Sequence, residues 1–178
     1  MGFCGSIPSE SGTYSRHHAA VSAVVAAGLV LVLPLGATPA VAAGAWAVLT
    51  AAGVAIDLDH FLMARLVRGD WANARRAIAN PRAAVLDQSE LFDPADLWPL
   101  HRLLSHAVLA PIAVAAAWVG GDTLAAAGFE VTATAAALAM AVVLYVHVLT
   151  DLIWDVWRHD QYHEDVRRVA ADDDSTAP

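Results

Sequence analysis

Residues 131–153 read VTATAAALAMAVVLYVHVLTDLI, and this stretch decides the fold of the chain. Its length lies within the roughly 17 to 25 residues that a membrane-spanning helix needs. Near its end it contains His147 and Asp151, which are four residues apart and therefore project from one face of a helix. The stretch predicts a membrane helix that has a polar pair close to one end.

The rest of the chain has the composition of a membrane protein. Of its 178 residues, 58% are hydrophobic and 16% are charged, which is too apolar for an ordinary soluble domain of this size. Ala and Val dominate, and such small side chains let helix backbones pack closely in lipid. A soluble helical bundle with buried hairpins is the alternative, and the composition disfavours it.

Hydropathy divides the chain into two helical hairpins around a polar middle. Pro34 and Pro39 mark the turn of the first hairpin, because proline is a strong signal for a break between helices. The middle, residues 61–100, is too long for a bare connection, so we expect short helices in it, including one at the membrane surface over residues 71–78. The predicted spans are residues 19–35, 40–56, 104–119 and 131–153.

The predicted fold class is therefore all-α, an integral membrane bundle of four transmembrane helices in two hairpins with a helical cytoplasmic loop between them. We expect residues 1–170 to form a single membrane-embedded domain. Residues 171–178 are predicted to be a disordered acidic tail.

The arginines predict the orientation. Neither hairpin loop contains an arginine, and by the positive-inside rule the regions that do contain them face the cytoplasm. We expect a multi-pass protein of the cell membrane with both termini in the cytoplasm. The ten cations are Arg16 before the first span, Arg65, Arg68, Arg75, Arg76, Arg82 and Arg102 in the middle, and Arg158, Arg167 and Arg168 after the last span.

The charge balance restricts the partners and the source. Acids outnumber bases by eight, and every base other than histidine is arginine. This acidic balance argues against nucleic-acid binding, which needs clustered cations, and the apolar composition makes the lipid bilayer an expected partner. A lysine-free, acidic chain resembles proteins of halophilic archaea. The sequence leaves open whether copies of the chain form a homo-oligomer.

Polar clusters lie at one end of all four predicted spans. Cys4 is the only cysteine, which excludes a thiolate-rich zinc site, so a metal would be held by His and carboxylate groups. Helix ends are also where polar groups cost least in a membrane, and that is the simpler explanation of each cluster taken singly. The clusters are Arg16-His17-His18, Asp57-Leu58-Asp59-His60, His101 to His106, and His147 to Asp151.

Spacing ranks the residues within these clusters. Asp57 and His60 are three apart and share a face of a helix, whereas Asp59 points elsewhere unless the helix has ended. His101 and His106 are five apart, so they converge only if His101 precedes the start of its helix. We favour His18 over the adjacent His17, which faces another direction. Asp155, His159 and His163 continue the four-residue rhythm of the last span, and we interpret them as a solvated helix face.

The order of these motifs resembles the LexA-binding, inner membrane-associated hydrolases, a family of membrane-bound metal-dependent hydrolases. The resemblance covers most of the chain from His17 to Asp151. The family is also distantly similar to zinc-dependent phospholipase C and nuclease folds, which are helical enzymes that cleave phosphodiesters. The matching elements are His18-Ala19-Ala20, Asp57-Leu58-Asp59-His60, His101-Arg102-Leu103-Leu104-Ser105-His106 and His147-Val148-Leu149-Thr150-Asp151.

The resemblance implies a metal-dependent hydrolase that cleaves a phosphoester or another ester, with a small-molecule or lipid ester as its substrate. One to three divalent ions, zinc in particular given the His and carboxylate donors, would lower the pKa of bound water to about 7. Asp57 or Asp59 would bridge ions or accept the proton of the water, and His101 would be a ligand or a general acid. Arg102 would bind an anionic substrate, or would serve simply as a positive-inside anchor. The expected metal ligands are His18, Asp57, His60, His106, His147 and Asp151.

Two other functions fit the same residues. In a proton or metal transporter, His147, Asp151 and Asp57 would form a relay, but the outer halves of the predicted spans contain no His, Asp, Glu or Arg. In a non-catalytic membrane protein, the same ligands would hold a structural metal.

Overall fold

In a computed structural model of the protein, residues 15–36, 38–86, 91–92, 99–157, 159–160, 164 and 167 are described. Every regular element within these ranges is a helix, which confirms the all-α prediction. The expected acidic tail, residues 171–178, lies outside the described residues.

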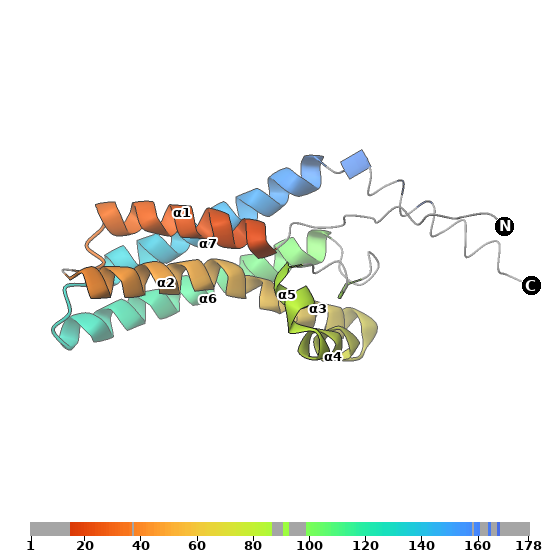
Figure 1. Ribbon diagram of the computed structural model, residues 1–178, viewed down its shortest axis with the longest axis horizontal. Coiled ribbons are helices and arrows are strands. Elements are labelled where there is room, and N and C mark those ends of the chain that lie inside the picture. The colour runs from red at the N-terminus through yellow and green to blue at the C-terminus, as the bar shows by residue number, and fades with distance from the viewer. Residues whose placement is uncertain are drawn as a thin grey trace, which may run out of the picture.

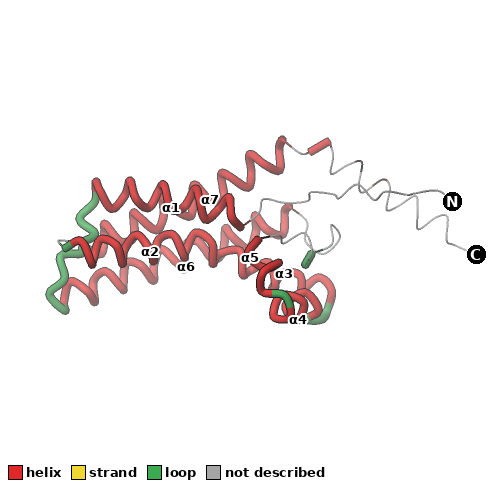
Figure 2. The backbone as a smooth tube through the Cα atoms, in the orientation of Figure 1, coloured by secondary structure: helices red, strands yellow, loops and turns green. Residues whose placement is uncertain are grey.

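Four long helices lie side by side and form the body of the protein (Figure 1). They are α1 (Ser15–Val32), α2 (Pro39–Ala55), α6 (Pro99–Ala126) and α7 (Ala133–Trp157). The connection between α1 and α2 and the connection between α6 and α7 lie at the same end of the bundle, which we call the hairpin end (Figure 2). The opposite end, where α6 begins and α7 ends, is called the site end.

Local chemistry explains the turns at the hairpin end. Helix α1 ends at Val32, two residues before Pro34, because proline lacks the backbone N–H that a helix interior needs. Helix α2 begins with Pro39 in its first turn, and the Thr38 hydroxyl accepts a hydrogen bond from the Val41 backbone N–H at 3.3 Å. Gly128 has a φ of +88° just after α6, a conformation that favours glycine.

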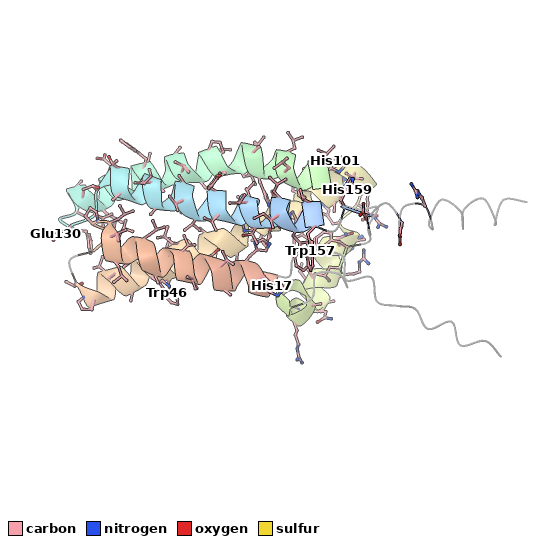
Figure 3. The ribbon with its side chains drawn as sticks, turned by 90° about the horizontal axis from the view of Figure 1, so that it is seen from above. His17, Trp46, His101, Glu130, Trp157 and His159 are labelled. Atoms are coloured by element: carbon pink, nitrogen blue, oxygen red, sulfur yellow. The ribbon has the colours of Figure 1, made fainter. Side chains whose placement is uncertain are left out.

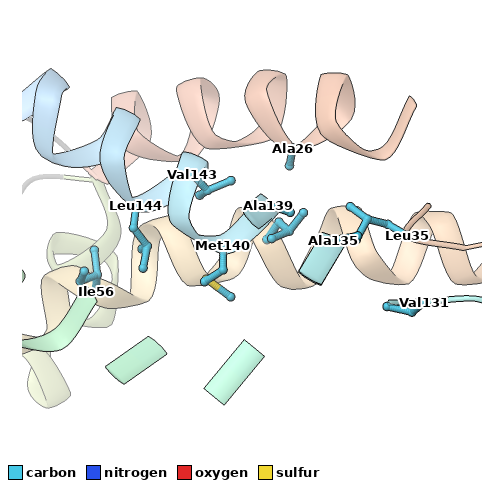
Figure 4. Packing of buried hydrophobic residues seen from close by; sticks show 10 residues of the cluster. Ala26, Leu35, Ile56, Val131, Ala135, Ala139, Met140, Val143 and Leu144 are labelled. Atoms are coloured by element: carbon cyan, nitrogen blue, oxygen red, sulfur yellow. The ribbon is translucent and has the colours of Figure 1, made fainter. Parts of the chain in front are cut away.

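Helix α7 is the centre of the bundle, because it contacts α1, α2 and α6. In its apolar stretch 39% of the residues are buried, against 6% in α6. The core consists largely of small and branched side chains from α7, among them Ala135, Ala139 and Val143, which face Ala26 of α1 (Figure 4). Leu49 of α2 belongs to the same cluster. Residues 131–153 therefore decide the fold by packing against every other long helix.

Within the described residues, three helical stretches are long and apolar enough to cross a membrane, so the protein is a multi-pass membrane protein. They are Pro39–Arg68, which combines α2 with the helices that follow it, Leu100–Ala126 and Ala133–Trp157. The apolar part of α1, His17–Val32, is shorter. The structure thus provides three of the four predicted spans as candidates.

The predicted boundaries of two spans were wrong. The third segment was expected at residues 104–119, but α6 runs from Pro99 to Ala126 and continues through Pro111. Proline costs a helix one hydrogen bond, and its neighbours in the bundle tolerate the loss. The last segment was expected to end at Ile153, but α7 continues to Trp157.

The polar middle folds into short helices at the site end, as predicted. They are η1 (Ile56–Leu58), α3 (Asp59–Arg68), α4 (Ala72–Ala79) and α5 (Pro81–Leu86). Gly69 ends α3 with a φ of +85°, and the Arg65 guanidinium lies 5.9 Å from the centre of the Trp71 ring. Trp71 and Ile78 are exposed at the two ends of α4. This arrangement places the start of α3 against α6, where the polar residues of both helices meet.

Candidate metal centre

Seven polar side chains from five helical elements are buried together at the site end of the bundle. Counted over the whole residue, none of the seven exposes more than 7% of its surface. In the view of Figure 3, His17, His101 and Trp157 mark this end and Glu130 marks the hairpin end. The seven are His18 from α1, Asp57 from η1, Asp59 and His60 from α3, His106 from α6, and His147 and Asp151 from α7.

Four of these residues form a group whose donor atoms could hold one metal ion. One donor atom each from Asp57, His106, His147 and Asp151 lies within 4.8 Å of all the others. His147 Nε2 is 3.2 Å from Asp57 Oδ1 and 3.4 Å from Asp151 Oδ2. His106 Nε2 is 3.7 Å from Asp57 Oδ1 and 3.5 Å from Asp151 Oδ2. We call these four residues the four-ligand group.

Two hydrogen bonds orient the imidazoles of this group. His147 Nδ1 is 2.6 Å from the Gly53 carbonyl oxygen, and because a carbonyl only accepts, Nδ1 carries the proton and donates it. His106 Nδ1 is 2.8 Å from Asp59 Oδ2 and donates to that carboxylate. Both rings therefore turn their Nε2 atoms to the centre of the group. A backbone carbonyl or a carboxylate behind a histidine is the usual support of a metal-ligating imidazole.

Several atoms at the centre that could bind a metal make no hydrogen bond, although they are buried. They include Asp57 Oδ1, His106 Nε2 and His147 Nε2. Buried polar atoms without a hydrogen bond are rare in folded proteins, because each one gives up its hydrogen bonds to water. A cation at the centre would satisfy all three. The residues present therefore fit a divalent metal ion.

A second set of ligands overlaps the first. Asp59, His60 and His106 also offer donor atoms within 4.8 Å of one another. His60 Nε2 is buried without a hydrogen bond, 3.6 Å from Asp59 Oδ1 and 3.7 Å from Asp57 Oδ1. The ring of His60 stacks on that of His106, with 5.3 Å between the ring centres. The two sets share His106, so they belong to one polar centre.

The structure brings His18, and not His17, to this centre. His18 Nε2 is 3.1 Å from Asp151 Oδ1, and its ring stacks on His147 with 4.0 Å between the centres. The neighbouring His17 is exposed, and its ring lies 6.2 Å from that of Trp154. Neighbouring positions on a helix differ in direction by about 100°, which explains the contrast.

The bounds of the helices settle the two conditions under which His101 and Asp59 would reach the site. His101 does not precede its helix, because α6 begins at Pro99, and it belongs to neither set of ligands. It lies half-buried in the first turn of α6. Asp59 does not point away from the site, because a short 3₁₀ turn, η1, ends at Leu58 and α3 begins at Asp59, which places the carboxylate against His106.

The interpretation of Asp155 as part of a solvated face was also wrong. Asp155 is ion-paired with Arg102, and only 28% of its side chain is exposed. His159 is exposed, as expected, and His163 lies outside the described residues.

Sequence reasoning missed Gly53, which supports His147. A Cβ atom on Gly53 would overlap Ser22 Oγ and would lie 2.8 Å from Ser22 Cβ and 3.0 Å from Val143 Cγ1. Only glycine lets α2 approach α1 and α7 this closely while its carbonyl accepts from His147. Gly53 stands among alanines and valine, so nothing in the local sequence distinguished it.

The fold and the centre together define a class, a multi-pass helical membrane protein with a buried His/Asp cluster that could bind a metal ion. Comparison of the chain with protein-family models, with curated proteins and with solved structures found no match.

Proposed function

We propose that this protein is a membrane-bound metal-dependent hydrolase that cleaves a phosphoester or another ester at the cytoplasmic face. The observation that carries the proposal is the convergence of buried donor atoms that make no hydrogen bond, on Asp57, His106 and His147, with both imidazoles held by partners behind them. The resemblance of the four motifs to the LexA-binding, inner membrane-associated hydrolases supports the same activity.

The four-ligand group would hold the metal, with His18 and His60 completing the ligand set from the two sides. Zinc is the ion we propose, because neutral imidazoles and carboxylates without thiolates are a common ligand set for catalytic zinc. When bound, such an ion acidifies water and polarises the oxygen of an ester or a phosphoryl group. One to three ions fit the two overlapping sets of ligands.

The protein's own side chains would handle the protons. In hydrolysis the oxygen of water bonds to the phosphorus or acyl carbon, the bond to the leaving oxygen breaks, and one proton moves from the water to that oxygen. We propose that Asp57 accepts the proton of the water and passes it to the leaving oxygen. Asp59, whose Oδ2 accepts from His106, contributes by orienting that ligand.

The depth of the centre agrees with a site at the membrane surface. Along α6, twenty residues separate His106 from Ala126, and along α7 eighteen separate Ala133 from Asp151. At a rise of about 1.5 Å per residue these lengths are about 30 Å and 27 Å, close to the thickness of the hydrocarbon core of a bilayer. If the hairpin end lies at one surface, the centre lies at the other. Both lipid and soluble esters can reach such a site.

We place the site end in the cytoplasm of the cell and make α1 the fourth span. The arginines support this orientation, because none of the ten lies in either hairpin connection. Helix α1 packs against α2 and α7, although its apolar part is shorter than those of the other spans. The lysine-free, acidic composition supports a halophilic archaeon as the source.

The activity is tested on the purified protein in detergent. Bound metal is measured by mass spectrometry, and hydrolysis of bis(p-nitrophenyl) phosphate and of a broad panel of esters is measured before and after Asp57→Ala. We expect stoichiometric zinc and turnover that Asp57→Ala abolishes. If metal is bound but nothing is hydrolysed, the protein holds a structural metal and the hydrolase proposal is wrong. If neither metal nor turnover is found, the metal site itself is wrong.

The transporter alternative is less well supported. A relay across the membrane needs polar groups through its whole depth. The core towards the hairpin end, by contrast, consists of apolar side chains such as Ala26, Ala135 and Met140.

A further inference from the structure

Arg102 and Asp155 form a second pair between α6 and α7, one helical turn beyond the four-ligand group. His106 of α6 faces Asp151 of α7, and four residues nearer the site end Arg102 Nη2 is ion-paired with Asp155 Oδ1. The two helices are antiparallel neighbours, so the pairs are successive contacts along one interface. Four residues correspond to about 6 Å along the helix axis.

Exposure increases from the inner pair to the outer pair. The side chains of His106 and Asp151 are 1% and 9% exposed, whereas those of Arg102 and Asp155 are 14% and 28% exposed. The outer pair therefore lies on the solvent side of the four-ligand group. A molecule that reaches the group along this interface meets Arg102 first.

Arg102 has hydrogen-bonding capacity that the protein does not use. Its Nε is buried and makes no hydrogen bond, whereas its Nη2 is held by Asp155. A guanidinium presents its N–H donors in a planar fork that matches the oxygens of a phosphate or carboxylate. A buried donor of this kind costs free energy unless a ligand accepts from it.

The charge of the centre makes such a cation favourable for an anionic substrate, because a single divalent ion would not offset all of its carboxylates. Asp57, Asp59 and Asp151 place three carboxylates within the centre. A phosphate group that approached these carboxylates alone would be repelled. The ion pair with Asp155 restricts the long Arg102 side chain to one position, so that less conformational freedom is lost when a substrate binds.

We propose that Asp155 is a positioning residue that holds Arg102 beside the four-ligand group, and that Arg102 there binds the phosphate oxygens of the substrate. The site then takes phosphoesters in preference to uncharged carboxylic esters. This inference rests on the proposed hydrolase function and names its substrate class.

Kinetics with two substrates test the proposal. For zinc-loaded, full-length protein, KM and kcat are measured with bis(p-nitrophenyl) phosphate, which is anionic, and with p-nitrophenyl acetate, which is uncharged. Arg102→Gln is expected to raise KM for the phosphodiester roughly 10- to 100-fold, the usual cost of a lost charge-assisted hydrogen bond. Asp155→Asn should raise it less, and Asp155→Glu should restore most of the affinity. In all three variants, kcat for either substrate and KM for the acetate should change by no more than about twofold.

Matched variants separate positioning from a merely structural role. Arg75→Gln and Asp122→Asn make the same chemical changes at exposed residues on α4 and at the hairpin end of α6, and they should leave both substrates unaffected. A parallel fall of kcat on both substrates in Asp155→Asn, without recovery in Asp155→Glu, would overturn the positioning role.

Binding of inorganic phosphate provides a readout that does not need turnover. Calorimetry on the metal-loaded protein should show phosphate binding that Arg102→Gln weakens about 10-fold or more, with unchanged zinc content. If the wild type binds phosphate in this way but hydrolyses nothing, the anion site stands and the hydrolase proposal fails. If the wild type hydrolyses esters and Arg102→Gln changes neither KM nor phosphate affinity, the anion site fails and the hydrolase proposal stands.

Two substrates distinguish a lipid source of the phosphate group from a soluble one. Phosphatidylglycerol vesicles supply a lipid phosphodiester, and bis(p-nitrophenyl) phosphate supplies a soluble one. Turnover of either that depends on Arg102 supports the proposal and identifies the source. Turnover of both without dependence on Arg102 contradicts it.

Discussion

The two ends of the same four helices have opposite interiors. Towards the hairpin end, α7 contributes Ala135 and Ala139 to a core of apolar side chains. Towards the site end, the same helix contributes His147 and Asp151 to a buried polar centre. Apolar packing is not driven by the hydrophobic effect inside a bilayer, so close contact of small residues must hold the helices in place. Packing at the apolar end thus fixes the distances between the helices. These distances bring the polar side chains together at the other end.

Loss of the Asp57 carboxylate at the site end should have the largest effect on metal affinity. Asp57 Oδ1 lies within 3.7 Å of the Nε2 atoms of His60, His106 and His147, so Asp57→Ala removes a shared partner of three imidazoles. We expect metal affinity to fall by more than about 100-fold, measured by competition with a chelator. Asp122→Asn, at the other end of the bundle, is the control and should bind metal normally.

Removal of the support behind a ligand should have a smaller effect. Asp59→Asn keeps an oxygen that can accept from His106 Nδ1 but removes the negative charge. Metal affinity is expected to fall roughly 10- to 100-fold, the usual cost of losing such a partner. The same chelator titration measures it. An affinity equal to that of the wild type would show that Asp59 does not orient His106.

Gly53→Ala tests whether helix distance and ligand orientation are coupled. The new Cβ would force α1 away from α2 and displace the carbonyl that holds His147. We expect the unfolding free energy to fall by about 1 to 3 kcal/mol, and metal affinity to fall with it. Thermal unfolding in detergent and the metal titration measure the two effects.

Two further variants make the Gly53 experiment specific. Gly44→Ala on the same helix should be neutral, because a Cβ there meets nothing within 4 Å. Ser22→Gly combined with Gly53→Ala should recover part of the loss, because it removes both Ser22 atoms that the new Cβ would meet first.

A large side chain in the apolar end should affect stability alone. Ala139 is fully buried, so Ala139→Leu overpacks the core and should cost about 1 to 3 kcal/mol in unfolding experiments. Zinc stoichiometry should stay at the wild-type value in the folded fraction. A loss of zinc from folded protein would mean that the two ends are not separable.

The smallest effect is expected at His17. It is exposed and belongs to neither set of ligands, so His17→Ala should change stability by less than about 0.5 kcal/mol and leave metal affinity unchanged. His18→Ala, one residue further along, is the matched comparison and should weaken metal binding. Equal effects of the two variants would contradict the placement of His18.

Much of the fold could be predicted from the sequence, because hydropathy and helical periodicity are local properties. The run at residues 131–153 predicted the central helix, and the spacing of His147 and Asp151 predicted their shared face. The ends of α6 were misplaced because His101 and Arg102 at its start, and Gly120, Gly121 and Asp122 near its end, lower its hydropathy without ending the helix. The apolar part of the first helix, His17–Val32, is shorter than the three candidate spans because Pro34 follows it closely.

Local patterns of residues are sufficient to identify a helical membrane protein whose histidines and aspartates lie near one end of the helices. Which of their atoms meet depends on how the helices pack. The carboxylate of Asp59 behind His106, the carbonyl of Gly53 behind His147 and the pairing of Arg102 with Asp155 all depend on how α2, α3, α6 and α7 are rotated and aligned against one another. That alignment follows from the packing of side chains from distant parts of the chain, which no local pattern of residues contains.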